Sequence, residues 1–172
     1  MNQAAAQYIE KLRGYLGSKD PVQTLREAPE LLKRLLDGIS DSAAKNPPAP
    51  GKWSVTEIMA HLADSELVTG YRYRSILSAE DGAPIAAYDQ NRWAEAGNYA
   101  AVPLPVSLAS FTALRHMNLR LLESLPANAW DKYGTHAERG RESLRDLVQL
   151  CAGHDLNHMA QIKNILGAAQ AA

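Results

Sequence analysis

Apolar residues recur along most of the chain at spacings of three and four, the period that places them on one side of an α-helix. The four clearest stripes cover residues 25–39, 55–77, 108–125 and 144–165. No run of alternating apolar and polar residues between turn signals indicates a β-strand. The pattern therefore predicts an all-α fold with four long helices.

The N-terminal region carries two helix signals with a break between them. A short helix is expected over residues 8–16, after which Asp20 can cap a second helix whose first position is Pro21. Pro29 lies inside the stripe that follows and predicts a kink or a fresh helix start, because proline lacks a backbone N–H and crowds the preceding turn. The proline-rich segment 46–51 ends this region.

The second long helix has the strongest start signal in the sequence. Ser54 and Glu57 have the spacing of a capping box, in which each side chain accepts a hydrogen bond from the backbone of the other residue. Trp53 and Ile58 occupy the two positions of a hydrophobic staple around it. A helix from Ser54 to about Leu77 is therefore expected.

A long connection separates the second helix from the third. It has about 25 residues after Asp81, which is more than a hairpin needs and enough to cross a helical bundle. Ser107 is the predicted N-cap of the third helix, and Pro126 ends that helix.

The fourth helix is expected to begin at Ser143, which has Asp146 three residues later, and to stop near Gly167. Four amphipathic helices joined by one long connection are typical of a four-helix bundle. The sequence therefore predicts one domain over residues 1–172, with a long crossover between the second and third helices.

Composition and charge narrow the class of protein. Eighteen Lys and Arg residues against nineteen Asp and Glu residues give a net charge of −1, too little positive charge for a typical nucleic-acid partner. The N-terminus has no basic stretch leading into an apolar run, so a cytoplasmic protein is expected. The longest uncharged span, residues 96–114, contains two prolines that would interrupt a membrane-spanning helix. No association with a membrane is therefore expected.

Histidine is the residue type that points to chemistry. His154 and His158 lie one turn apart on the apolar side of the fourth helix, so both rings can reach one divalent cation. An unpaired buried imidazole costs about 1–3 kcal/mol, so the pair requires either a shared cation or a hydrogen-bond network. The only cysteine, Cys151, excludes an intrachain disulfide and is more typical of a small buried residue than of a fourth ligand.

Three other histidines are candidates for a third ligand. His116 lies opposite the apolar stripe of its helix and is expected on the surface. His136 falls in a glycine-containing segment and is interpreted as an exposed loop residue. His61 lies at the flank of the second helix's stripe, where periodicity alone does not decide between core and surface.

Three segments together resemble a known family. Residues 52–54 and 58–66, taken with Gly153-His154-Asp155-Leu156-Asn157-His158-Met159-Ala160-Gln161-Ile162, are closely similar to the DinB-like metal-binding proteins. The resemblance extends over nearly the whole chain. It implies a bundle of up-down-down-up topology and a homodimer, and the family name does not imply DNA binding.

The same resemblance implies a divalent metal held by His61, His154 and His158. Three imidazoles suit zinc or nickel and leave a coordination position open for water or substrate. The implied function is a thiol-dependent transferase or a hydrolase-like enzyme acting on a small molecule, possible partners including a low-molecular-weight thiol. Two alternatives remain: a non-catalytic, stress-related dimeric bundle that binds a metal or small molecule, and a structural dimer whose histidines bond to one another.

Four polar residues are candidates to support such a site. Asp155 lies on the interior side of the fourth helix and Gln161 lies one turn beyond His158, so either could hold a ligand ring or a bound water. Glu66 and Arg72 lie further along the second helix, where an ordinary ion pair explains them as well as catalysis does.

Overall fold

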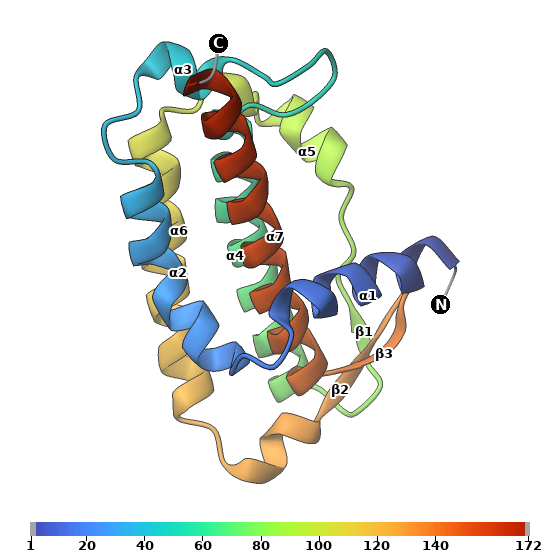
Figure 1. Ribbon diagram of the computed structural model, residues 1–172. Coiled ribbons are helices and arrows are strands. Elements are labelled where there is room, and N and C mark those ends of the chain that lie inside the picture. Colours follow the sequence, from blue (N-terminus) through green and yellow to red (C-terminus); the bar gives the residue numbers. More distant parts are fainter. Residues whose placement is uncertain (1–2, 171–172) are drawn as a thin grey trace.

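Four long helices form the body of the protein in the computed structural model, which describes residues 3–170 (Figure 1). Residues 1–2 and 171–172 of the predicted domain lie outside the described residues. In Figure 1, α2 (Pro21–Leu35) and α7 (Leu144–Gln170) rise along the bundle, whereas α4 (Val55–Ser78) and α6 (Leu104–Glu123) descend. The structure confirms the predicted all-α four-helix bundle.

Three of these helices begin where side-chain caps were predicted. The carboxylate of Asp20 accepts a hydrogen bond from the first turn of α2. Ser54 and Glu57 form a complete capping box at the start of α4. Ser143 and Asp146 make the same reciprocal pair of bonds before α7. Each cap satisfies backbone N–H groups that have no partner within the helix.

Pro29 lies inside α2 without interrupting it, so the predicted fresh helix start does not occur there. The helix continues through it to Leu35. Because proline has no N–H, the carbonyl of Leu25 loses its partner in the helix, and the guanidinium of Arg115 donates to this carbonyl at 3.0 Å. A hydrogen bond from α6 thus replaces the one that the proline removes.

Two other helix boundaries also differ from the prediction. The third long helix, α6, begins at Leu104, and Ser107 is buried inside it instead of capping it. Pro105 lies in its first turn, where the missing N–H is one that a helix leaves unpaired. Gly167 does not stop α7, which continues to Gln170.

A small sheet departs from the purely helical prediction. It consists of β1 (Pro84–Ile85), β2 (Tyr133–His136) and β3 (Gly140–Ser143), in the order β1-β2-β3. The pair β1 and β2 is parallel, with Ile85 opposite His136, and the pair β2 and β3 is antiparallel. These strands have only two to four residues, too few for a visible alternation, so the pattern did not reveal them.

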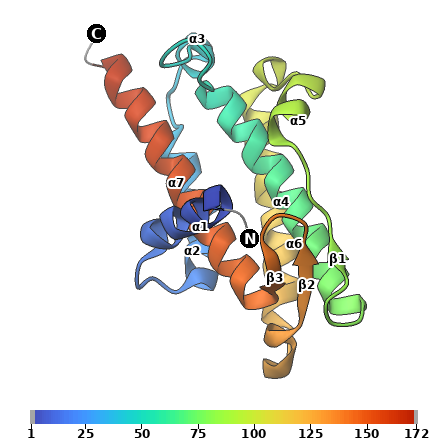
Figure 2. The same cartoon turned by 90° about the vertical axis from the view of Figure 1, so that its right-hand side faces the viewer.

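The crossover between α4 and α6 runs alongside α4 and returns the chain to the end where α4 began (Figure 2). It contains β1, the short helix α5 (Gln90–Ala96) and the 3₁₀ turn η1 (Tyr99–Ala101), each packed on α4. A further short helix, α3 (Asp41–Lys45), precedes α4, and a second 3₁₀ turn, η2 (Ala127–Asp131), precedes β2. Because of this return, α4 and α6 run in the same direction.

The interior of the bundle has two apolar clusters with buried polar groups between them. The first cluster lies near the start of α4 and includes Ile58, Met59, Leu62, Phe111 and Ile162. The second lies near the end of α4 and includes Tyr73, Ile76, Leu122, Leu147 and Val148. Four buried polar residues on α4, α6 and α7 form what we call the polar layer: Glu66, Arg115, Asn118 and Asp155.

Across residues 3–170, no helix combines the length and apolar character that crossing a membrane requires.

The N-terminal helix α1 (Gln3–Leu16) crosses α7 close to the histidines (Figures 1 and 2). The two backbones meet at Gly153, where an added Cβ would lie 2.3 Å from the carbonyl oxygen of Leu12. Only glycine allows this approach, because the opposing atom belongs to the backbone and cannot rotate away. Gly153 therefore sets how closely α1 covers this part of the bundle.

Replacing Gly153 with alanine is expected to destabilise the protein by about 1–3 kcal/mol, because the added methyl group pushes α1 away from α7. Gly167→Ala is the matched control, since it lies in the same helix and its Cβ would meet nothing within 4 Å. The control should be neutral or stabilising by up to about 1 kcal/mol, the helix preference for alanine. Urea unfolding of both variants measures the difference, and equal stabilities would contradict the close approach.

Candidate metal centre

Three histidines from two helices meet in the bundle interior. His61 comes from α4, and His154 and His158 come from successive turns of α7. The Nε2 atom of His154 lies 3.1 Å from that of His61 and 3.1 Å from that of His158. One ring nitrogen from each residue falls within a group no wider than 4.8 Å. The structure thus brings together the three residues that the family resemblance implied.

This spacing fits ligands of a common ion. Nitrogen atoms about 2.0 Å from one zinc ion at tetrahedral angles stand about 3.3 Å from one another, close to the two distances of 3.1 Å. The Nδ1 atom of His158 lies 3.0 Å from Oε1 of Gln161, and this bond requires a proton on Nδ1. The neutral ring of His158 therefore turns an unprotonated Nε2 toward the other two histidines.

The environment keeps these imidazoles neutral. Burial lowers the pKa of His61 to about 3, with the neighbouring His158 adding to the effect. Burial also lowers the pKa of His158 to about 4 and that of His154 well below its usual value. Neutral imidazole is the form that binds a metal, so all three rings can act as ligands at pH 7.

Neighbouring side chains hold the rings in place. Gln161 accepts from His158, one of the two supporting roles that the sequence suggested for it. The hydroxyl of Ser65 lies 3.3 Å from Nε2 of His61 and 2.9 Å from the hydroxyl of Tyr88. The ring of Trp53 packs on His61 with a centroid separation of 4.9 Å. Within the described residues, Nδ1 of His61 has no hydrogen-bond partner.

Asp155 has a different role from the one suggested for it. Its carboxylate accepts a hydrogen bond of 2.7 Å from Arg115, and the same guanidinium donates to Glu66 at 2.7 Å. Asn118 donates to the other carboxylate oxygen of Glu66 at 2.8 Å. Burial raises the pKa of Asp155 to about 6, although Arg115 opposes this shift. Asp155 therefore belongs to the polar layer beside His154. Among residues 3–170, no histidine ring forms a hydrogen bond with it.

The remaining candidates are also settled by their contacts. Glu66 pairs with Arg115 and not with Arg72, so the suggested ion pair between Glu66 and Arg72 is absent from the part of the chain described. Cys151 lies outside the ligand group. Burial holds the pKa of its thiol well above the usual value, and its sulfur lies 3.8 Å from Glu66. His116 is exposed on α6, as expected.

His136 was predicted to be an exposed loop residue, and this prediction is wrong. It belongs to β2, is only 3% exposed and accepts a hydrogen bond at Nδ1 from the backbone N–H of Glu138 at 3.2 Å. Its strand pairs with β1 from the crossover, far away in sequence, and this pairing buries it. Short-range patterns carry no signal for such a pairing.

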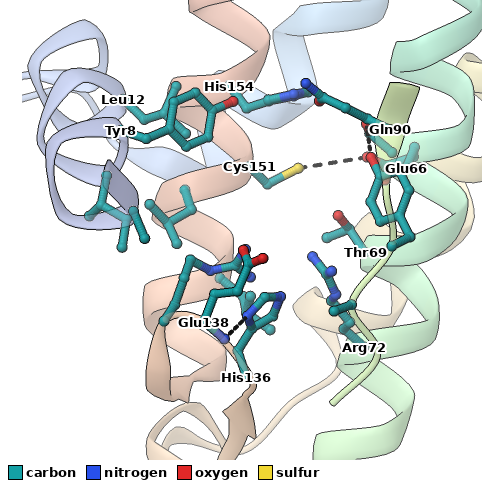
Figure 3. Close-up of a pocket in the computed structure, with 18 of the residues that line it drawn as sticks. Tyr8, Leu12, Glu66, Thr69, Arg72, Gln90, His136, Glu138, Cys151 and His154 are labelled. Atoms are coloured by element: carbon teal, nitrogen blue, oxygen red, sulfur yellow. Dashed lines mark hydrogen bonds between the residues drawn. The ribbon is translucent and has the colours of Figure 1, made fainter. Parts of the chain in front are cut away.

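A cavity of about 680 Å³ lies beside the histidines, between α1, α4, the crossover, the β2–β3 hairpin and α7 (Figure 3). His154 and Tyr8 lie at one end of it, and Arg72 and His136 lie at the other. Its walls include Leu62, Leu147 and the thiol of Cys151. A volume of this size suits a small-molecule ligand.

The lowered histidine pKa values predict how stability depends on pH when no metal is bound. Unfolded imidazoles take up protons below about pH 6.5, whereas the folded rings stay neutral down to about pH 4 or 3. The unfolded state therefore binds more protons in this window, and the free energy of unfolding should fall as pH drops from about 6.5 to about 4. A pKa lowered from 6.5 to about 4 corresponds to about 3 kcal/mol. Asp155, whose pKa is raised to about 6, acts in the opposite direction, but it is one group against three histidines.

Urea unfolding at stepped pH in the presence of a chelator measures this slope. His158→Gln should flatten the slope, because it removes one of the three buried titrating rings. His116→Gln should leave the slope unchanged, because that ring is exposed. A stability that is flat between pH 6.5 and 4.5 in the original protein would contradict the burial of neutral imidazoles.

The chain belongs to the DinB superfamily, whose family model matches residues 24–162. The matched region includes all three histidines and most of the bundle. The fold, the triad and this match agree with the family resemblance noted in the sequence.

Several relatives are similar over most of their length. A protein from Oceanobacillus iheyensis named "putative metal-dependent hydrolase" is 26% identical over 144 residues, which cover 84% of this chain and 83% of that protein. A protein of the same name from Bacillus cereus is 26% identical over 144 residues, 84% of this chain and 82% of that one. Among solved structures, YfiT from Bacillus subtilis, described as a probable metal-dependent hydrolase with an unusual four-helix bundle topology, superposes with a TM-score of 0.81. It is 26% identical, and the match covers 87% of this chain and 86% of YfiT.

Proposed function

We propose that this protein is a metal-dependent enzyme in which His61, His154 and His158 hold a divalent cation, zinc or nickel. The observation that carries the proposal is the meeting of three neutral imidazole nitrogens within 4.8 Å beside a cavity of about 680 Å³. The names of the relatives, which refer to metal-dependent hydrolases, support it.

The donor set fits a catalytic metal better than a structural one. Structural zinc sites are usually closed by four protein ligands, whereas catalytic sites use three and leave a position for water or substrate. The ligand group found among residues 3–170 contains three histidines and no carboxylate or thiolate. Imidazole ligands suit zinc and nickel, and this neutral set would leave the full positive charge of the cation available to a reacting group.

A bound cation of this kind would act as a Lewis acid that lowers the pKa of a water or a thiol reaching it. The residues of the chain would do the rest. Gln161 fixes the tautomer of His158. The hydroxyls of Ser65 and Tyr88, 2.9 Å apart at the edge of the triad, can take or give a proton to a group bound there. Leu62 and Leu147 line the cavity and limit the access of water.

Two reaction classes suit this arrangement, and both use a small-molecule substrate. Hydrolysis by an activated water is favoured by the names of the relatives. Transfer that begins with a low-molecular-weight thiol is favoured by the uncharged ligand set, because a site with no anionic ligand stabilises an incoming thiolate most strongly.

An activity screen tests the proposal on protein purified without a histidine tag. Ester and amide substrates test hydrolysis, and thiols combined with electrophilic acceptors test transfer. Turnover should disappear when the metal is removed and return when zinc or nickel is restored. Stoichiometric metal with no turnover in either class would favour a metal-binding bundle without catalysis, and absence of metal binding would overturn the proposal.

A further inference from the structure

Arg72 is a buried cation that forms no ion pair with a carboxylate among residues 3–170. It reaches the cavity from α4, at the end away from His154 (Figure 3), and it is only 8% exposed. Its Nε donates to the carbonyl of Ala86 at 2.8 Å. Within residues 3–170, its two terminal nitrogens make no hydrogen bond and no ion pair.

The carboxylates around the cavity are engaged elsewhere or exposed to solvent. Glu66 and Asp155 are bound by Arg115. The second arginine of the lining, Arg139, forms an ion pair with Glu142. Glu138 lies exposed on the turn between β2 and β3, and Asp89 caps α5.

Burial therefore has the largest effect on Arg72. It lowers the pKa of the guanidinium, and the positive charge of Arg139 lowers it further. Glu142 opposes these effects only in part, and the ring of Tyr88, 5.9 Å from the guanidinium carbon, supplies no anion. A buried charge without a partner is costly, and that cost is relieved when an anion binds beside it. The terminal nitrogens of Arg72 present the planar fork that binds a carboxylate through two parallel hydrogen bonds.

His136 supplies a second donor at the same end of the cavity. Its Nδ1 accepts from the backbone of Glu138, so the proton of the neutral ring is on Nε2. Burial lowers the pKa of His136, which keeps the ring neutral at pH 7. In Figure 3, His136 and Arg72 lie on opposite sides of the lower end of the cavity, each directed toward the space between them.

We infer that Arg72 and His136 bind a carboxylate of the substrate, so that the cavity takes an elongated carboxylic acid with its reacting group at the histidines. The reacting end of this inference rests on the proposed function, whereas the carboxylate end rests on Arg72 and His136 alone. The Cα atoms of residues 61 and 72 are separated by about 16 Å along α4, from a rise of about 1.5 Å per residue. Side chains on a helix lean toward its N-terminus, so Arg72 extends toward the triad and the ligand spans on the order of 10 Å.

Thiols that carry a distant carboxylate test both ends at once. Protein loaded with Co²⁺ is titrated with ω-mercaptooctanoate and, in parallel, with the uncharged ω-mercaptooctanamide, and the sulfur-to-cobalt absorption band reports binding at the metal. The acid is expected to bind about tenfold to a hundredfold more tightly than the amide, the range of a charge-assisted pair of hydrogen bonds. Equal affinities in the original protein would overturn the carboxylate inference while leaving thiol binding intact.

Variants assign the preference to its residues. Arg72→Gln should remove the preference for the acid, and Arg72→Lys, which keeps the charge without the planar fork, should retain part of it. Arg74→Gln is the matched control, because Arg74 is exposed on the same helix and bonds to Gly70 and Asn118 instead of lining the cavity. His136→Phe removes the second donor, which lies on β2 and not on a helix of the bundle. A several-fold loss of affinity for the acid is therefore measurable in this variant even if Arg72→Gln does not fold. A preference for the acid that survives in both Arg72→Gln and His136→Phe would refute the assignment.

A metal-free titration separates this inference from the proposed function. If cobalt binds but neither thiol gives the absorption band, the open coordination position fails and the carboxylate site is judged alone. Calorimetry with octanedioate on metal-free protein should then show binding that is at least tenfold weaker in Arg72→Gln than in Arg74→Gln. Absence of binding, or equal binding by both variants, would end the carboxylate inference independently of the metal.

Discussion

Replacing His61, His154 or His158 with alanine should abolish stoichiometric metal binding. Each change removes one of the three proposed ligands, and the two that remain could not hold the ion in the same geometry. A loss of affinity on the order of a hundredfold or more is expected, since even residues that only support a ligand ring contribute tenfold to a hundredfold. Elemental analysis of untagged protein and competition with a chromophoric chelator measure the stoichiometry and the affinity.

His116→Ala is the matched control for these variants. It removes the same side chain from an exposed position on α6, so metal content should remain that of the original protein. The triad variants should remain folded without metal, because neutral buried rings are replaced by a small apolar side chain. Metal content that is unchanged in all three triad variants would show that the ion is bound elsewhere, and the proposed site would be wrong.

Replacing Arg115 with methionine should produce the largest loss of stability among single substitutions in the polar layer. Arg115 is 1% exposed, and it alone binds the carboxylates of both Glu66 and Asp155. Methionine keeps much of the apolar volume but leaves two buried carboxylates without their cation. Breaking a buried ion pair in this way costs about 3–5 kcal/mol. Chemical denaturation at pH 7 measures the change in the free energy of unfolding.

Removing the negative charges as well distinguishes the effect of unpaired buried charge from a simple loss of packing. The triple variant Arg115→Met, Glu66→Gln, Asp155→Asn should recover most of the lost stability, because no uncompensated charge remains. Arg120→Met, an exposed arginine on the same helix, should change stability little. If Arg115→Met costs no more than Arg120→Met, the layer is not held by its charges.

The helical frame and two of the three metal candidates could be predicted from local sequence patterns. Ser54 and Ser143 mark helix starts through neighbours three residues away, and His154 and His158 lie one turn apart on an apolar face. Such signals depend on contacts between residues close in sequence. His61 could not be placed by periodicity, because a flank position faces the interior only when the neighbouring helices are known.

Arg115 and Arg72 were missed or misassigned for a related reason. Arg115 lies four residues after Phe111, inside the apolar stripe of α6, which is a signal that a charged residue is buried. Its partners come from α4 and α7, so no pattern within α6 names them. Arg72 was paired with Glu66 on the grounds of a shared helix, but the carboxylate is taken by the arginine from α6. The partner of a buried charged residue thus depends on the tertiary structure and not on proximity in sequence.

Pro29 makes possible a hydrogen bond between α2 and α6, which are distant in sequence. By leaving the carbonyl of Leu25 without its usual donor, it creates an acceptor on α2 that only a neighbouring chain segment can use. Arg115 uses it, and the same guanidinium reaches Asp155 beside His154. A substitution that restored the missing N–H at position 29 would remove the bond between α2 and Arg115 and weaken the packing behind the three histidines.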